Sequence, residues 1–249
     1  MTLLAVLGLA SKAQAQTPSP EDIEVKDRIE ALSENPSPDQ LARKSDSMKQ
    51  ITAMGVPVLD TLPVIAAEAQ TTRRSSDEVA ERAMALMIAA VKGETMDQDL
   101  IEAIIVQYGA IEYFTAQELA FISDSAPAEQ TRVQMTWRYE SVAVLLWALG
   151  FIDQLPPPDT IIDAAMLGDT FRQLGPDGLR QEARLRPQSE ILDQADLIYR
   201  LHWAVVAARV ANQPAPEGLH PGIIYERHYA LNWLYGYMGL DWDNMRTDT

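Results

Sequence analysis

Residues 128–152 read AEQTRVQMTWRYESVAVLLWALGFI and end in a continuous apolar run, residues 142–152. Ahead of this run, Trp137 precedes Val144 by seven positions, a spacing that places both side chains on one face of an α-helix. The run is far shorter than the roughly 20 apolar residues needed to cross a bilayer. We therefore predict a long helix at about 128–149 that is buried in a protein core.

The same helical spacing continues on both sides of this segment. Ser75 with Glu78, and Thr115 with Glu118, fit the capping box, in which a hydroxyl and a carboxylate bind the free amides of a helix's first turn. No stretch alternates convincingly between apolar and polar residues, and only residues 222–225 suggest a brief extended piece. We predict an all-α protein with one globular domain of about eight helices, at about 38–53, 76–92, 97–108, 116–123, 128–149, 159–174, 188–211 and 223–238.

Proline and glycine clusters mark the loops between these helices. The clusters lie at 54–57, 156–158, 175–178 and 214–218. None of them is a glycine-rich loop of the kind that cradles a phosphate. Before the first helix of the domain, residues 16–37 are predicted to form a polar linker with a short helix at 21–33. The helical domain then comprises residues 38–249.

The composition limits the classes of partner. The chain has 249 residues, 47% of them apolar, and a formal charge of −16 from 36 acidic and 20 basic residues. This excess of negative charge repels a phosphate backbone, so we expect no nucleic acid partner. The absence of cysteine removes thiol nucleophiles, disulfides and thiolate metal ligands. We expect neither a metal nor another cofactor.

Residues 1–15 have the pattern of a signal peptide. They are apolar over residues 3–10 and then reach Ala-Gln-Ala at residues 13–15, a small-x-small cleavage pattern. We predict a mature chain that begins at Gln16 and is periplasmic or secreted. Against this, no basic residue precedes the apolar run, and Lys12 follows it. If the leader is not a signal peptide, or if the start is misassigned, the protein is cytoplasmic.

Several long blocks of sequence identify a family. They occur in this order: Trp137-Arg138-Tyr139-Glu140, Leu145-Leu146-Trp147-Ala148-Leu149-Gly150, Leu185-Arg186-Pro187, Tyr199-Arg200-Leu201-His202-Trp203-Ala204 and Glu226-Arg227-His228-Tyr229-Ala230-Leu231-Asn232-Trp233-Leu234. From about Leu41 to the C-terminus, the chain resembles the bacterial family of domains of unknown function numbered 4272. The resemblance implies a predominantly helical domain and brings no activity with it. The first forty residues lie outside it.

The candidates for chemistry are Glu140, Glu226, His202 and His228. All four fall on apolar faces of predicted helices, where a carboxylate without a partner costs roughly several kcal/mol. We therefore expect the two acids to be either paired or protonated, and Arg138, Arg200 and Arg227 are their possible partners. The candidates for binding are the arginines and tryptophans of the same blocks: Trp137, Arg138, Arg200, Trp203, Arg227 and Trp233.

Local spacing makes two further predictions. Asp196 precedes Arg200 by four positions, the favourable order for an ion pair on one helix. His220 stands next to Pro221 in a predicted loop, so we expect it to be exposed to solvent and without a role.

Two interpretations of these residues remain open. In the first, the acids, arginines and tryptophans form a structural network that fixes how three long helices cross. In the second, Glu140 or Glu226 is a general base and His202 or His228 is an acid or a metal ligand. No His-Glu-x-x-His or Gly-x-Ser-x-Gly motif is present. We expect an exported, non-catalytic binding or structural module with a protein or small-molecule partner, the alternative being an acid/base or metal-assisted hydrolase.

Overall fold

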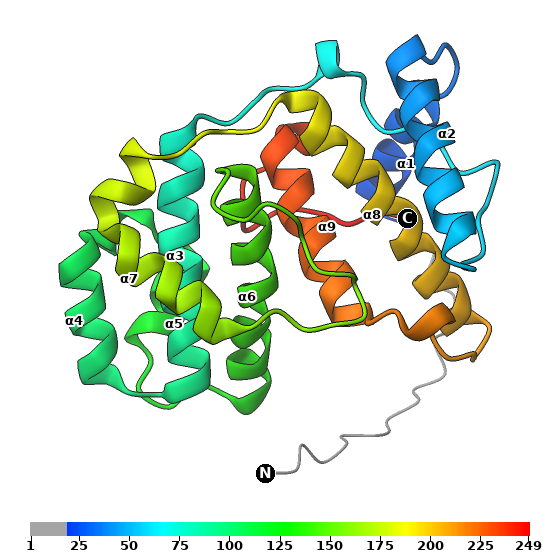
Figure 1. The fold of residues 1–249 in the computed structure, drawn as a ribbon. Coiled ribbons are helices and arrows are strands. Elements are labelled where there is room, and N and C mark those ends of the chain that lie inside the picture. Colours follow the sequence, from blue (N-terminus) through cyan, green and yellow to red (C-terminus); the bar gives the residue numbers. More distant parts are fainter. Residues whose placement is uncertain (1–18) are drawn as a thin grey trace.

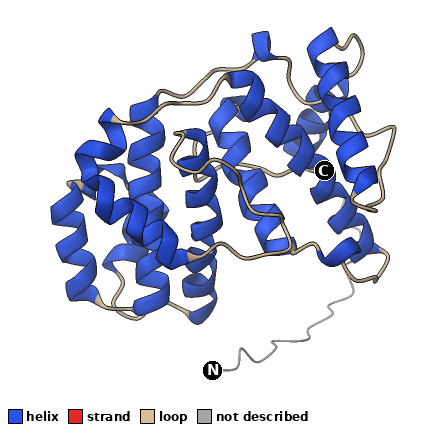
Figure 2. Ribbon diagram, in the orientation of Figure 1, coloured by secondary structure: helices blue, strands red, loops and turns tan. Residues whose placement is uncertain are grey.

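The structure, a computed structural model, describes residues 19–249, so the predicted signal peptide lies outside it. The described residues form nine α-helices and no strand, which confirms the predicted all-α class (Figures 1 and 2). The short helix predicted in the linker is the first of the nine. The helices are α1 (Pro20–Leu32), α2 (Pro38–Ala53), α3 (Ser76–Thr95), α4 (Gln98–Tyr108), α5 (Ala116–Ser123), α6 (Glu129–Ala148), α7 (Ala164–Gln181), α8 (Gln188–Val210) and α9 (Pro221–Tyr235).

Five of the helices form a row in which each packs against the next. The order of the row is α3, α6, α9, α8 and α2 (Figure 1). Helices α4, α5 and α7 pack against α3, and α7 also contacts α6. The centre of this row is α6, in which every residue from Tyr139 to Ala148 is buried. The apolar run therefore forms a core helix, as predicted. Within the described part of the chain, no helix combines the length and the hydropathy of a membrane-spanning segment.

Both predicted capping boxes are present. The Ser75 hydroxyl accepts a hydrogen bond from the Glu78 amide at 3.2 Å, and the Glu78 carboxylate accepts one from the Ser75 amide at 2.8 Å. Thr115 and Glu118 make the same reciprocal pair at the start of α5, at 3.2 and 3.0 Å. These contacts are local along the chain, which explains why the sequence alone located both helix starts.

Two predicted boundaries of α7 are wrong. The helix begins at Ala164 instead of Asp159, because the Asp163 carboxylate caps it and accepts a hydrogen bond from the Ala165 amide at 2.9 Å. The loop predicted at 175–178 is a kink within α7. At this kink Gly175 has φ 61°, a conformation that favours glycine, and the helix resumes at the next residue.

Residues 222–225, suggested as a brief extended piece, belong to helix α9 instead. The helix begins at Pro221 and ends at Tyr235 rather than near Met238, because Gly236 adopts a left-handed conformation with φ 75° and terminates it.

Close contact between α3 and α6 depends on Gly93. A Cβ atom added there would lie 2.7 Å from the Arg132 carbonyl oxygen and 2.8 Å from the Thr136 hydroxyl oxygen. Backbone atoms of α6 cannot yield without moving the helix. We expect Gly93→Ala to lower the free energy of unfolding by about 1 to 3 kcal/mol, the usual cost of overpacking, measured by urea denaturation.

The matched control is Gly168→Ala in α7. An added Cβ there meets the end of the flexible, exposed Arg172 side chain at 3.2 Å. Because alanine favours a helix over glycine by about 1 kcal/mol, this variant should be neutral or more stable. Equal effects of the two substitutions would contradict a close packing role for Gly93.

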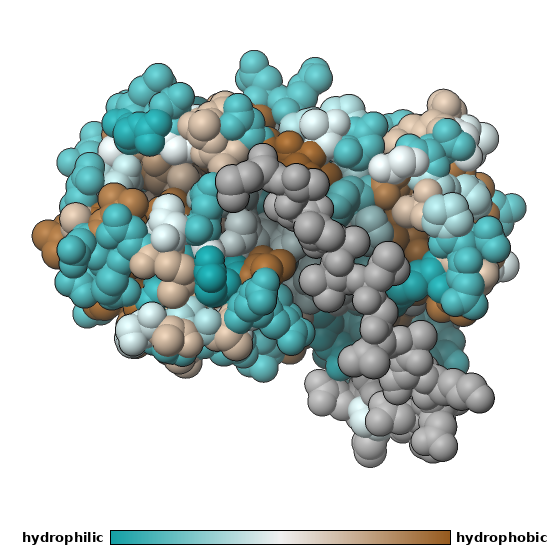
Figure 3. Space-filling model, turned by 90° about the horizontal axis from the view of Figure 1, so that it is seen from below, coloured by the Kyte–Doolittle hydropathy of each residue, from teal (hydrophilic) through white to brown (hydrophobic). Residues whose placement is uncertain are grey.

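The surface is mainly hydrophilic. On the face seen in Figure 3, hydrophobic side chains form small patches among hydrophilic ones. The most exposed large apolar side chains, Val106 and Val210, lie on different helices, α4 and α8. Scattered apolar residues of this kind are normal on a globular protein and do not define a docking face.

Candidate functional site

Glu140 and Arg227 form an ion pair in the interior, between α6 and α9. Arg227 donates from Nε and Nη2 to Glu140 Oε2, at 3.0 and 2.9 Å, and both side chains are almost fully buried. The other carboxylate oxygen accepts a hydrogen bond from the Ile162 amide at 2.7 Å, and Arg227 Nη1 donates to the Pro156 carbonyl at 2.6 Å. Both oxygens of Glu140 are therefore occupied by protein donors, and the pair also holds the loop before α7.

Glu226, the residue before Arg227 on α9, is held in the same way. Arg138 Nη1 donates to its two carboxylate oxygens at 3.2 and 3.0 Å, and the Ser141 hydroxyl donates to Oε2 at 2.8 Å. The guanidinium of Arg138 also lies over the ring of Tyr229, 4.9 Å from its centre. Two arginines thus neutralise the two candidate acids across the α6–α9 contact.

Asp196 and Arg200 form the predicted ion pair within α8. Arg200 donates from Nε and Nη2 to the two carboxylate oxygens, each at 2.8 Å, and Nη2 also reaches the Pro63 carbonyl at 3.2 Å. The candidate binding residue Arg200 therefore connects α8 to the segment that precedes α3. It does not lie with Glu140 or Glu226.

The structure brings the two candidate histidines together. His202 Nδ1 on α8 lies 2.8 Å from His228 Nδ1 on α9, and both rings are buried. One Nδ1 must carry the proton and the other must accept it, so the two neutral rings are opposite tautomers. Burial lowers the pKa of His202 from 6.5 to about 4, with the charge of Arg209 adding to the effect. Burial, followed by the neighbouring His202, lowers the pKa of His228 well below its ordinary value.

The candidate tryptophans are divided among different contacts. Trp137 stacks on His220 with ring centres 5.0 Å apart, and Trp233 packs against Trp242 at 5.6 Å. Trp203 is partly buried against the core. The prediction that His220 is exposed and without a role is wrong, because its ring is partly covered and its Nδ1 caps α9 by accepting the Gly222 amide at 3.2 Å.

The histidine pair lies between two cavities. His202 lines a cavity of about 560 Å³, which we call the Trp137 cavity; it is also lined by Trp137, Arg209, Tyr225 and Glu226. His228 lines a cavity of about 550 Å³ on the other side, bounded by α1, residues 64–72, α8, the end of α9 and the C-terminal segment. We call this second cavity the tyrosine pocket. Both volumes fall in the range that holds a small organic ligand.

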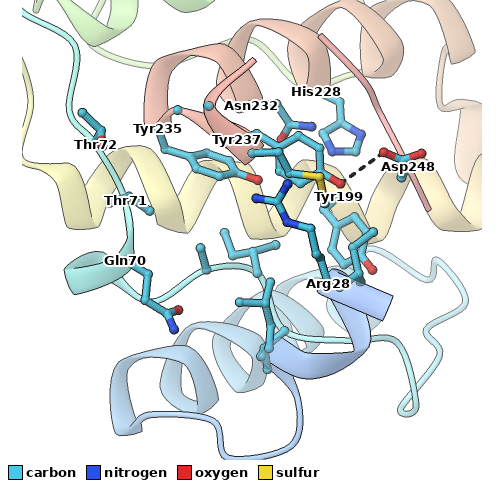
Figure 4. A pocket seen from close by; sticks show the side chains of 18 of the residues that line it. Arg28, Gln70, Thr71, Thr72, Tyr199, His228, Asn232, Tyr235, Tyr237 and Asp248 are labelled. Carbon is cyan, nitrogen blue, oxygen red and sulfur yellow. Dashed lines mark hydrogen bonds between the residues drawn. The ribbon is translucent and has the colours of Figure 1, made fainter. Parts of the chain in front are cut away.

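The tyrosine pocket combines polar groups from distant parts of the chain. Figure 4 shows the labelled side chains around it, which are Arg28, Gln70, Thr71, Thr72, Tyr199, His228, Asn232, Tyr235, Tyr237 and Asp248. The Tyr237 hydroxyl donates to the Asp248 carboxylate at 3.1 Å, and Arg246 pairs with the same carboxylate at 2.9 Å. Asp248 is therefore already neutralised. Its contacts fix the C-terminal segment against the pocket.

Two phenol groups of the pocket have no such partner. The Tyr199 and Tyr235 side chains are buried, and neither hydroxyl makes a hydrogen bond with any other described residue. Burial raises the pKa of both phenols, that of Tyr235 most strongly, so both stay protonated and can donate. Neither phenol oxygen is among the fully enclosed polar atoms that lack a partner, so both hydroxyls keep accessible surface at the pocket that they line and can donate to a group bound there.

Sequence reasoning missed these pocket residues. Tyr199 and Tyr235 occur at helical spacing among apolar residues, a pattern typical of core positions. Arg28 belongs to the predicted linker, and Asp248 stands at the end of the chain, so neither is near the tyrosines in sequence. Of the candidates, only His228 reaches this pocket, whereas Trp137, His202 and Glu226 line the Trp137 cavity. Among the described residues, no group of three or more histidine or acidic side chains is arranged to hold a metal ion.

Comparison with known proteins identifies one family. Residues 43–245 match the family described as a domain of unknown function, DUF4272. No curated protein and no solved structure matches the chain. The match includes the residues that α8 and α9 contribute to the tyrosine pocket, but it excludes Arg28 and Asp248.

Proposed function

The chain belongs to the DUF4272 family, and from this premise we propose that it is a non-catalytic binding module whose ligand site is the tyrosine pocket. One observation carries the proposal: the buried acids are bound to arginines, whereas the buried phenols of the pocket have no partner among the described residues. A set of donors that the protein leaves unpaired around a cavity of this size is typical of a ligand site.

The contacts of Glu140 support a structural role for its ion pair with Arg227. A general base needs a free oxygen directed at a substrate, and both oxygens of Glu140 accept hydrogen bonds from Arg227 and Ile162. Removing either partner of such a pair would leave a buried charge. We therefore assign Glu140 and Arg227 to the packing of α6 on α9.

The rival proposal is an acid/base or metal-assisted hydrolase. One observation favours it: His202 and Glu226 line the same Trp137 cavity. However, Glu226 is neutralised by Arg138 and Ser141, and the lowered pKa of His202 keeps its ring neutral at pH 7. An imidazole with a pKa of about 4 is a weak base and is not present as an imidazolium acid at pH 7, and the carboxylate is already occupied, so binding is the better supported function. Export to the periplasm or medium remains part of our proposal on the evidence of the leader sequence.

A blocked pocket tests the binding proposal. Ala66 lines the tyrosine pocket and is partly buried, so Ala66→Trp should place an indole in the cavity without removing a hydrogen bond. We expect fragments from a library of mixed charge to bind the full-length protein in ligand-observed NMR, and to bind the variant at least about tenfold more weakly. Ala103→Trp, on the exposed face of α4, is the control and should keep full binding. If no fragment distinguishes the two variants, the pocket is not the ligand site.

A further inference from the structure

Arg28 is an exposed residue of α1 and the charged group of the tyrosine pocket that has no counterion among the described residues. Its guanidinium extends from α1 into the pocket (Figure 4), and it makes no ion pair or hydrogen bond with another described residue. By contrast, the other arginine of the lining, Arg74, donates to the Trp233 carbonyl at 3.2 Å and pairs with Glu78 at 3.6 Å. The one acid of the lining, Asp248, is bound by Arg246 and Tyr237. The lining therefore has one uncompensated positive charge, in a chain whose formal charge is −16.

The unpaired phenols point to the same kind of ligand. Tyr199 is 6% exposed and Tyr235 is 3% exposed, and their raised pKa values keep both hydroxyls neutral. A neutral hydroxyl at such a site can donate to an oxygen of a bound anion. Charge-assisted hydrogen bonds of this type are stronger than bonds between neutral groups.

The lining also has an apolar part, formed by Ile29, Leu32, Val64, Ile65 and Met238, beside the neutral polar side chains of Gln70, Thr71, Thr72 and Asn232. A ligand that matches both the arginine and this apolar part joins one anionic group to an apolar body. A single unpaired arginine balances a single negative charge, which favours a carboxylate over a phosphate dianion.

We infer that the tyrosine pocket binds a small organic monocarboxylic acid, with its carboxylate on Arg28 and the Tyr199 and Tyr235 hydroxyls and its apolar body against the aliphatic wall. This inference rests on the proposed binding function and adds the chemical class of the ligand. Helix α1 supplies the cation while burying only Val25 among its described side chains, so a bound acid also holds this helix in place.

Matched acids and amides test the inference. The probes are phenylacetate with phenylacetamide, hexanoate with hexanamide, and indole-3-acetate with indole-3-acetamide, titrated into the full-length protein by isothermal calorimetry. We expect at least one acid to bind about tenfold or more tightly than its amide. Arg28→Gln should remove this preference, because it removes the charge of the lining that has no counterion among the residues the structure describes.

Lys26→Gln is the control variant. Lys26 is on the same helix, is exposed, and pairs with Glu30 at 3.6 Å, so its loss changes the net charge equally without altering the pocket. It should keep the preference for the acid. Hydrogen exchange in residues 20–32 should also slow when the acid binds the wild-type protein, and should not slow in Arg28→Gln.

Three outcomes would overturn the inference: equal binding of acid and amide, an unchanged preference in Arg28→Gln, or no binding of any probe. If neutral fragments still distinguish Ala66→Trp from Ala103→Trp, the proposed function stands and only the ligand class is wrong. If no fragment distinguishes them, both proposals fail.

Discussion

Glu140→Gln is expected to lower the free energy of unfolding by about 3 to 5 kcal/mol, because it leaves the Arg227 guanidinium buried without a counterion. Glu140 is fully buried, and its carboxylate accepts two hydrogen bonds from Arg227 and one from the Ile162 amide. Urea denaturation followed by circular dichroism measures the change. An effect of this size is a large part of the total stability of a typical domain.

An ion pair at the surface, Glu190 with Arg186, provides the control for the loss of a buried pair. Glu190→Gln removes the partner of Arg186 at a surface site, where an ion pair contributes about 0 to 1 kcal/mol. The double variant Glu140→Gln with Arg227→Gln should be more stable than Glu140→Gln alone, since it removes the unpaired charge. Unchanged stability in Glu140→Gln would argue against the structural assignment of this acid and reopen the catalytic one.

Lowering the pH from 8 to 5 is expected to reduce the free energy of unfolding by about 4 kcal/mol through His202 and His228. In the unfolded chain both imidazoles take up protons as the pH falls through 6.5. In the folded protein, burial lowers the pKa of His202 to about 4 and that of His228 well below 6.5, so both rings bind fewer protons at pH 5 than they do in the unfolded chain. Stability is therefore complete above pH 6.5 and falls toward the folded-state pKa values, by about 1.4 kcal/mol per histidine and pH unit.

Other titrating groups act in a different pH range. Hydrogen bonds from Ser37 and Ser75 lower the pKa values of Asp39 and Glu78 below 3.8 and 4.5, so these acids lose their contribution only at lower pH. Denaturation curves at pH 8, 6 and 5 therefore measure the effect of the histidines apart from that of these acids. His220→Gln leaves the pair intact and should keep the pH dependence, whereas His202→Gln should reduce it.

Titration of the imidazoles by NMR offers a direct check that does not depend on a variant's folding. Neither His202 nor His228 should titrate above pH 5 in the folded protein. A ring of the pair that titrates near neutral pH would contradict the buried neutral pair and would favour the acid/base enzyme.

The sequence by itself determined the features that depend on neighbours along the chain. The apolar run of residues 142–152 predicted the buried central helix, and the reciprocal contacts of Ser75 with Glu78 located the start of α3. The Asp196–Arg200 pair followed from i, i+4 spacing. Each of these interactions closes within about one helical turn, so its geometry is set once the local conformation is helical.

The start of α7 shows where local information ends. The sequence from Asp159 onward favours a helix, but the Ile162 amide donates to Glu140, 22 positions away in sequence, and α7 starts only after Asp163. A contact between distant residues here overrides the local preference. The sequence could not predict it, because nothing near Ile162 indicates a carboxylate from α6.

Only the tertiary structure decided which buried groups are paired and which are free. Sequence indicated that Glu140 and Glu226 would be paired or protonated, but the packing of α6 on α9 selected Arg227 as the partner of the first and Arg138 as that of the second. The same packing of helices placed His202 beside His228 and left the hydroxyls of Tyr199 and Tyr235 without a partner among the described residues. Helical spacing specifies the face on which a side chain lies. The partner it meets depends on how the helices pack, and that arrangement is settled by the whole core at once.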